Sequence, residues 1–352
     1  MPGSKNQTAE IVLPSGNINE TVSFFSDELG FQLESIFPAD DPIEAVFSGY
    51  GLRIRLRKDK SIHPGIITIS EKQAENITAP NGTKIQFRDS EESYFLPEGN
   101  QSLQVSRLNE AQWKIGRAGM EYRDLIPDRY GGRFIASHIR IAKAGPVPDY
   151  VHYHKIRFQI IFCYKGWAKV VYEDQGEPFF FMAGDCILQP PEIRHRVLEN
   201  SNGFEVVEIS SPASHMTCTD PELDLPTGET NLNRVYNGQN FVHHIAKKAE
   251  WHPWRQPGFE VRNFGLSNAT NGLANVSVVK SIENFNHAFF THEGEFHFIF
   301  LLNGGLTLDN DQNDTHSLNP GDSITIPTGS SFVIIDCPIN SEFLEIHFQN
   351  NI

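Results

Sequence analysis

Near the start of the chain, strand-like apolar runs flank one amphipathic segment. Val22, Phe25 and Leu29 recur at the spacing of one face of an α-helix. Asn19 is the predicted N-cap of this helix, and Gly30 is a typical residue for its end. Apolar runs of strand length lie at 10–14, 31–37, 43–49 and 52–58. The pattern therefore predicts one βαβββ unit, a small α+β module.

From about residue 105 to the end, the apolar runs are short and rich in Val, Ile, Phe and Tyr, as in "RFIASHIRIA", "WAKVVYED" and "SITIP". Gly, Pro and Asn break them at close spacing, which is typical of strands joined by tight turns. No long helical pattern interrupts the series. This part of the chain is therefore predicted to be all β, with sandwiches or barrels.

Two parts of this β-rich region resemble each other. Aligning Gly166 with Gly304 places "HYHKIRFQIIFCYKG" on "FTHEGEFHFIFLLNG", and aligning Gly184 with Gly321 places "GDCILQPPEIRH" on "GDSITIPTGSSF". An internal repeat of this kind indicates two copies of one structural unit. We therefore predict three domains, with boundaries at 1–104, 105–235 and 236–352.

The length of 352 residues agrees with two or three domains. The 44 acidic and 29 basic residues give a net charge of -15, which disfavours binding to a phosphate backbone, so we expect no nucleic-acid partner. No apolar run approaches the roughly 20 residues of a membrane span, and we expect no membrane interaction. The start "MPGSKNQTAE" lacks the apolar core of a secretory signal, which predicts a cytoplasmic protein. Four widely spaced cysteines without a CxxC pair indicate neither a zinc knuckle nor a disulfide framework.

Candidate metal ligands gather in "VHYHKIRFQIIFCYKG", residues 151–166. His152 and His154 are two residues apart on a predicted strand and therefore share one face. A neighbouring strand of the same barrel would bring His195 alongside them. Three neutral imidazoles that face one point favour Fe(II), Mn(II), Ni(II), Cu(II) or Zn(II) over Mg(II) or Ca(II). The alternative is that these are buried histidines that only satisfy hydrogen bonds.

These residues resemble the two motifs of the cupin superfamily. The first motif has two His one residue apart, then a Glu and a Gly, and here His152, His154, Gln159 and Gly166 stand at these places. The second has Gly-Asp, Pro and a third His, matched by Gly184, Asp185, Pro190 and His195. The resemblance implies a mainly β fold with two jelly-roll barrels, a bicupin, and one divalent transition metal in the first barrel.

Gln159 departs from the motif, which has a Glu at this place. A Glu would supply a negative charge and a possible general base, whereas a Gln supplies an amide oxygen at most. The site then keeps the full charge of the metal ion, which favours an anionic, chelating substrate. We expect Gln159 to complete or tune the ligand set. The alternative is a barrel that has lost its metal.

Three further residues are candidates for catalysis near the predicted metal. His138 and Arg140 alternate on the strand "SHIRIA" and would face the same side, where they could receive a substrate carboxylate. Tyr150 shares the strand parity of His152 and is a candidate acid, base or hydrogen-bond donor.

The second barrel departs further from the motif. Its aligned positions hold Phe290, His292, His297 and Phe332, so phenylalanine replaces two of four ligands. We predict a degenerate, mainly structural barrel. The alternatives are an apolar pocket or a weak metal site, which His287 and Glu295 could complete.

The first module is similar to the glyoxalase/bleomycin-resistance superfamily, in "NETVSFFSDELGFQLE" and in "APNGTKIQF" at 79–87. Sites of that superfamily take metal ligands from two modules, and only one full module is visible here. We therefore expect this region to be structural, either covering a barrel or mediating pairing.

Together, the cupin resemblance and the neutral ligand set imply a metal-dependent oxidoreductase, a dioxygenase that acts on a small anionic substrate with dioxygen. Fe(II) is the ion we favour, and we expect a homodimer. A cupin lyase, isomerase or decarboxylase that works without oxygen is one alternative. A cupin that binds a small molecule without turnover is another.

Overall fold

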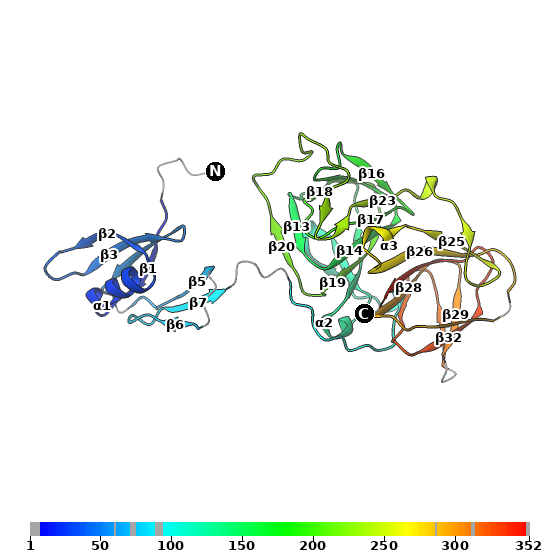
Figure 1. Ribbon diagram of the computed structural model, residues 1–352, viewed down its shortest axis with the longest axis horizontal. Coiled ribbons are helices and arrows are strands. Elements are labelled where there is room, and N and C mark those ends of the chain that lie inside the picture. Colours follow the sequence, from blue (N-terminus) through cyan, green and yellow to red (C-terminus); the bar gives the residue numbers. More distant parts are fainter. Residues whose placement is uncertain are drawn as a thin grey trace. The chain divides into compact units, whose positions relative to one another are not determined.

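The computed structural model describes residues 8–59, 61–70, 75–88, 94–285, 287–310 and 314–349. The chain divides into two compact units, Met1–Glu92 and Ser93–Ile352 (Figure 1). Strands dominate the regular structure, and the mainly β fold predicted from the sequence is confirmed. Among the described residues, no helix is long and apolar enough to cross a membrane.

The first unit contains the predicted βαβββ arrangement. Helix α1 (Ile18–Ser23) continues into the π-helical turn η1 (Phe24–Glu28), and the chain then turns at Gly30, whose φ is +72°. The N-cap is Asn17, whose side chain accepts a hydrogen bond from Glu20 N, so the prediction of Asn19 was wrong by two residues. Strand order in the sheet is β1-β4-β3-β2, with β1 and β4 parallel, for strands Ile11–Pro14, Leu52–Arg57, Glu44–Gly49 and Gln32–Phe37.

The core of this unit lies between the helix and the sheet, where Phe25, Phe47, Ile54 and Leu56 are fully buried. A second small sheet in the same unit has the order β5-β7-β6. Its strands are Ile66–Ser70, Lys84–Arg88 and Ile77–Thr78.

The second unit consists of two β-barrels, and the first barrel is built from two sheets. One sheet has the order β23-β17-β14-β19-β11-β10-β9, with strands Val242–His244, Cys186–Leu188, Phe158–Lys165, Phe204–Ser211, Ile135–Ile141, Glu121–Asp124 and Lys114–Ile115. The facing sheet has the order β16-β15-β18-β13-β20, with strands Phe179–Met182, Trp167–Tyr172, His195–Asn200, His152–Lys155 and Met216–Thr219.

The second barrel repeats this arrangement. One sheet has the order β24-β25-β26-β33-β28-β31-β8, with strands His252–Pro253, Phe259–Asn263, Ala274–Ser281, Glu342–Phe348, Phe296–Asn303, Ser323–Thr325 and Gln104–Ser106. The other has the order β27-β32-β29-β30, with strands Ala288–Thr291, Ser331–Asp336, Leu306–Asn310 and Thr315–Leu318.

The chain crosses between the barrels near the predicted domain borders. Strand β8 precedes the first barrel in sequence but pairs with β31 of the second. Strand β23 follows the first barrel and pairs back onto its β17. Each barrel is therefore completed by a strand from beyond its own continuous segment.

Glycines at matching turns support the alignment of the two repeats. Gly166 and Gly304 both have a left-handed backbone, with φ of +72° and +80°. A Cβ atom at Gly166 would collide with the hydroxyl of Ser201, and one at Gly304 would collide with the hydroxyl of Ser341. Only glycine fits both the conformation and the space at these two turns.

The two barrels share one hydrophobic core. Phe134 of the first barrel stacks on Phe296 of the second with ring centroids 4.1 Å apart, and Phe348 packs edge-on to Phe134. Beside these rings, Glu295 of the second barrel accepts hydrogen bonds from Arg133 and Arg157 of the first. An aromatic core and a largely buried ion cluster therefore join the barrels. The four cysteines are free thiols.

Candidate metal centre

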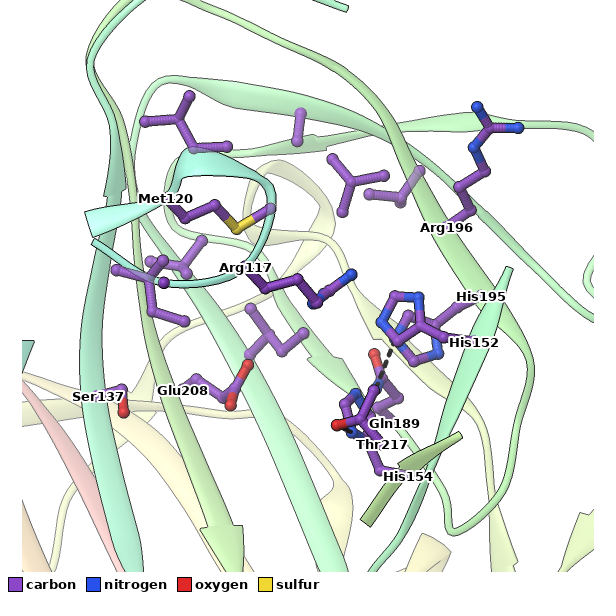
Figure 2. A pocket seen from close by; sticks show the side chains of 18 of the residues that line it. Arg117, Met120, Ser137, His152, His154, Gln189, His195, Arg196, Glu208 and Thr217 are labelled. Atoms are coloured by element: carbon purple, nitrogen blue, oxygen red, sulfur yellow. Dashed lines mark hydrogen bonds between the residues drawn. The ribbon is translucent and has the colours of Figure 1, made fainter. Parts of the chain in front are cut away.

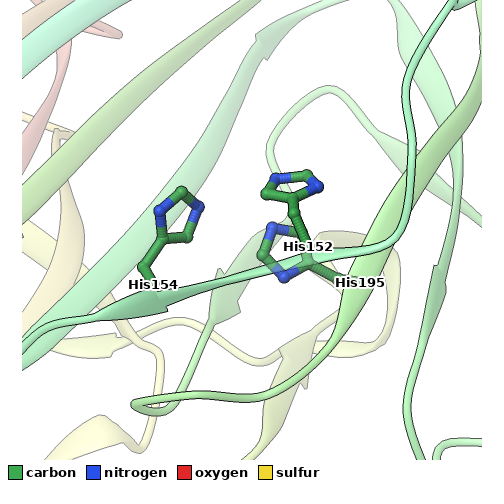
Figure 3. Close-up of side chains that lie close together, drawn as sticks. All are labelled: His152, His154 and His195. Atoms are coloured by element: carbon green, nitrogen blue, oxygen red, sulfur yellow. The ribbon is translucent and has the colours of Figure 1, made fainter. Parts of the chain in front are cut away.

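Three histidines meet in the first barrel. His152 and His154 lie two residues apart on β13, and β18 places His195 directly opposite His152. The ring centroids of His152 and His195 are 4.1 Å apart. The ring centroid of His154 lies 5.2 Å from that of His152 and 5.3 Å from that of His195. The three side chains each offer a ring nitrogen, all within 4.8 Å of one another (Figure 3). The geometry brings together the three histidines named from the sequence.

The Nδ1 atom of each ring already has a hydrogen-bond partner. His152 Nδ1 lies 2.8 Å from the carbonyl oxygen of Tyr150, and His195 Nδ1 lies 3.0 Å from that of Ile193. Because a carbonyl oxygen can only accept, both Nδ1 atoms carry the proton and both Nε2 atoms keep a lone pair. His154 Nδ1 has a comparable partner in the Thr217 hydroxyl at 2.9 Å. Such outer partners fix the tautomer that a metal ligand needs.

The Nε2 lone pairs of His152 and His195 are the ones that could bind a metal ion. His152 Nε2 is buried and has no hydrogen-bond partner among the described residues. His195 Nε2 lies 3.1 Å from the side-chain nitrogen of Gln189. An orphaned buried nitrogen is costly, and a divalent transition metal would satisfy it. The residues therefore fit a metal ion, and His152, His154 and His195 would hold it.

Burial keeps these histidines neutral. It lowers the pKa of His152 and holds the pKa of His154 and His195 well below the usual value of 6.5. The neighbouring rings add to the effect, because a second positive charge in the cluster would repel the first. Uncharged rings are the form that binds a metal.

Gln159 lies behind the histidines and is 1% exposed. Its side-chain oxygen accepts a 2.7 Å hydrogen bond from Gln189, and its amide also hydrogen-bonds the carboxyl group of Glu208. Gln189 in turn accepts a hydrogen bond from the Tyr172 hydroxyl at 2.9 Å. The structure therefore places Gln159 in a polar chain between His195 and Glu208.

Glu208 is a pocket residue that the sequence reasoning missed. It lies on β19 opposite Ile161 and projects into the barrel. Burial raises its pKa above the usual 4.5, and His215, Gln159 and Arg117 only partly offset this. The available signal was its parity in "FEVVEISS", where Glu208 shares one face of the strand with the apolar Phe204 and Val206.

The histidines border a cavity of about 440 Å³. Figure 2 shows Arg117 extending toward the histidines, with Glu208 across the pocket from them. Most of the remaining wall is aliphatic or aromatic and includes Ile139, Ile141, Ile161, Val170, Phe181, Phe204 and Val206. The cavity therefore combines one polar end with an apolar body.

Two of the three residues proposed for catalysis, His138 and Arg140, lie outside the cavity. His138 and Arg140 do share one face of β11, but this face points away from the cavity, which Ile139 and Ile141 line from the same strand. His138 Nε2 pairs with Glu205 at 2.8 Å, and Arg140 Nε pairs with Glu121 at 2.6 Å. The geometry therefore gives neither residue a route to a substrate in this pocket.

Tyr150 is 46% exposed at the edge of the histidine cluster. Its ring lies 5.8 Å from that of His152, and the Arg117 guanidinium lies 5.7 Å from its centroid. Tyr150 is therefore near the histidines but is not one of the cavity-lining residues.

Similar solved structures identify the fold. The protein Ylba from E. coli matches with a TM-score of 0.51 and 12% identity over 73% of this chain and 94% of its own. A salicylate 1,2-dioxygenase from Pseudaminobacter salicylatoxidans matches with a TM-score of 0.51 and 12% identity, over 74% of this chain and 88% of its own. A mutant of the oxalate decarboxylase of Bacillus subtilis matches with a TM-score of 0.52 and 12% identity, over 75% of this chain and 81% of its own.

These neighbours are cupin-fold proteins, so the predicted cupin fold of the two barrels is confirmed. No protein-family model matches this sequence, and no curated protein sequence matches it either. The similarity of the first module to the glyoxalase superfamily stays a prediction.

Proposed function

We propose that the first barrel is the active site of a metal-dependent oxidoreductase, a dioxygenase that acts on a small anionic substrate with a chelating head and an apolar body. The observation that carries this proposal is the convergence of three neutral histidines at the polar end of an otherwise apolar cavity. A ligand set without a carboxylate leaves the metal with its whole positive charge, which favours an anion. The aliphatic wall would then hold the rest of the molecule.

The metal, for which Fe(II) is our first candidate, would supply Lewis-acid polarisation of the substrate and the electrons that activate dioxygen. Mn(II), Ni(II), Cu(II) and Zn(II) suit the same imidazoles. The protein would hold the ion through His152, His154 and His195, while Tyr150 O, Thr217 and Ile193 O keep these rings oriented.

Arg117 is suited to receive the anionic head. One of its Nη atoms pairs with Asp149, whose side chain is fully buried, and this contact fixes the guanidinium at the cavity. The remaining N–H groups are donors that match a carboxylate or an enolate. An anion bound between Arg117 and the metal would be oriented at two points.

The test is oxygen uptake by protein loaded anaerobically with Fe(II), supplied with 2-oxo acids, hydroxy-aromatic acids and 1,3-diketones of increasing apolar size. We expect uptake with one of these classes, and none with the same protein carrying His195→Ala. Turnover of a substrate without oxygen uptake would contradict the dioxygenase proposal.

Glu208 favours a second candidate, a lyase, isomerase or decarboxylase that uses the same metal without oxygen. Such a reaction needs a group that moves a proton, and a carboxyl group with a raised pKa in the cavity is suited to this task. Product formation under argon, at the rate seen in air, would favour this candidate.

For either reaction, Glu208→Gln is expected to lower kcat by about 10²–10⁴-fold, because an amide cannot exchange the proton. Metal content should stay unchanged. In the wild-type protein the carboxyl stays protonated above the usual 4.5, so the pH profile of kcat should have a limb at the raised pKa. This limb should disappear in Glu208→Gln, and an unchanged profile would contradict the role of Glu208.

A further inference from the structure

A second group of three histidines lies in the second barrel, where the sequence suggested only two. His292, His297 and His347 each offer a ring nitrogen within 4.8 Å of the other two. Their ring centroids are 4.6 to 5.2 Å apart. His292 and His297 are fully buried. His347 comes from β33, far in sequence from the segment that aligns with the cupin motif.

The strand register explains why His347 joins this group. In the first barrel, Gln159 of β14 lies opposite Ser210 of β19. In the second, His297 of β28 lies opposite His347 of β33. The last strand therefore supplies a ring at the position where the first barrel has a serine.

The same register places a carboxylate beside each cluster. Glu208 lies opposite Ile161 in the first barrel, and Glu345 lies opposite Ile299 in the second. His297 Nε2 donates to Glu345 at 3.1 Å, and Arg255 holds the same carboxylate at 2.6 Å. This is the outer contact that orients a metal-binding histidine and leaves its other nitrogen available.

The group has unused donor capacity. His297 Nδ1 is buried and lacks a hydrogen-bond partner within the described part of the chain, and it keeps a lone pair because Nε2 of the same ring donates to Glu345. His292 Nδ1, which accepts a 3.3 Å hydrogen bond from Gly294 N, lies 3.3 Å from His347 Nε2, close to the spacing of two nitrogens that share one tetrahedral metal at about 2.0–2.1 Å each.

Hydrogen bonding alone leaves the buried His297 Nδ1 unsatisfied, which is unusual in a native core, and a metal ion bound there would satisfy it. Apolar rings close the side of the group where the first barrel has its ligands. Phe290 and Phe332 occupy the places of His152 and His195, face each other across β27 and β32, and stack with centroids 6.0 Å apart. The ion would therefore be bound by buried side chains beneath apolar rings, a setting that suits a structural role.

We propose that His292, His297 and His347 bind a divalent transition metal such as Zn(II), with Glu345 orienting His297, and that this ion stabilises the second barrel. His297 lies on β28 and His347 on β33, and His292 lies in the segment between β27 and β28. The ion would thus tie β33 to β28 and to the segment that precedes β28. This site differs from the motif pattern. The third histidine of the motif would stand at Phe332, and here His347 of β33 supplies the third ligand instead.

The experiment uses full-length protein with the first barrel disabled by His152→Ala and His154→Ala, purified without chelator or metal-affinity resin. After equilibration with Zn(II) and gel filtration, we expect about one zinc per chain by mass spectrometry. Adding His347→Ala should remove it, whereas the matched control His287→Ala, at an exposed histidine of the same barrel, should retain it. Zn(II) should also raise the melting temperature of the disabled protein but not that of the His347→Ala form.

Co(II) gives a readout that does not depend on the folding of the His347 variant. In the disabled protein, it should give the visible absorption bands of a nitrogen-ligated site, and Zn(II) should displace it. Absence of both bound zinc and these bands would overturn the proposal, as would zinc that survives His347→Ala in a folded protein. Because the first barrel is disabled throughout, either result is independent of the proposed enzymatic function.

Discussion

Replacing His154 by alanine is expected to lower the affinity of the first barrel for its metal by more than about 100-fold, since loss of an outer partner alone typically costs 10–100-fold. The reason is the composition of the ligand set. Three neutral imidazoles hold the ion without a carboxylate, so no anionic ligand compensates for the missing ring. Oxygen uptake or turnover should fall to background in the same variant.

Competition with a chromophoric chelator measures this affinity, and Thr217→Val provides a graded comparison. Thr217 touches only the Nδ1 side of His154, at 2.9 Å, so its loss should weaken binding by about 10–100-fold. His347→Ala should leave the affinity of the first barrel unchanged. Equal affinities in wild type and His154→Ala would show that the three histidines of the first barrel do not bind the metal.

The sequence identified the three clustered histidines of the first barrel because they lie in two local motifs. His152 and His154 share a face through strand alternation alone, and the glycine turns set the position of His195. Glu208 and His347 could not be found in this way. They lie on β19 and β33, outside the motif segments, and only the pairing register brings them beside the motif strands.

Strand alternation also has a limit that His138 and Arg140 illustrate. Alternation correctly predicts that both side chains share one face of β11. It does not say which face is the interior, because both faces of this strand are covered. One face lines the cavity through Ile139, and the other packs His138 against Trp113 and against Phe300 of the second barrel. In a two-barrel protein, a buried polar residue can therefore belong to the contact between the barrels.

That contact leads to the second large effect. Replacing Glu295 by alanine is expected to destabilise the two-barrel unit by about 3–5 kcal/mol, the usual cost of removing one partner of a buried ion pair. The Glu295 carboxylate accepts hydrogen bonds from Arg157 at 2.7 and 3.0 Å and from Arg133 at 2.5 Å. The side chain of Arg157 is 8% exposed, so the variant would leave a buried positive charge without its partner.

Urea unfolding followed by tryptophan fluorescence measures this effect, because all four tryptophans lie beyond residue 112 and report on the barrels only. Glu342→Ala is the matched control. It removes a carboxylate that pairs with Lys280 at 3.6 Å, where both side chains are about 30% exposed, and should cost at most about 1 kcal/mol. A similar loss in both variants would contradict the special role of the Glu295 cluster.

The pH dependence of stability separates the charge of Glu295 from its packing. Burial raises its pKa, but hydrogen bonds from Arg157 and Arg133 outweigh burial and lower the pKa below the usual 4.5. The unfolded chain therefore binds the proton more readily than the folded chain, and the carboxylate contributes stability above pH 4.5. This contribution is lost as the pH falls through the lowered pKa of the folded state.

The difference in unfolding free energy between wild type and Glu295→Ala should accordingly be constant near neutral pH and shrink below pH 4.5. A difference that does not change with pH would mean that packing, rather than the ion cluster, holds the two barrels together at this point.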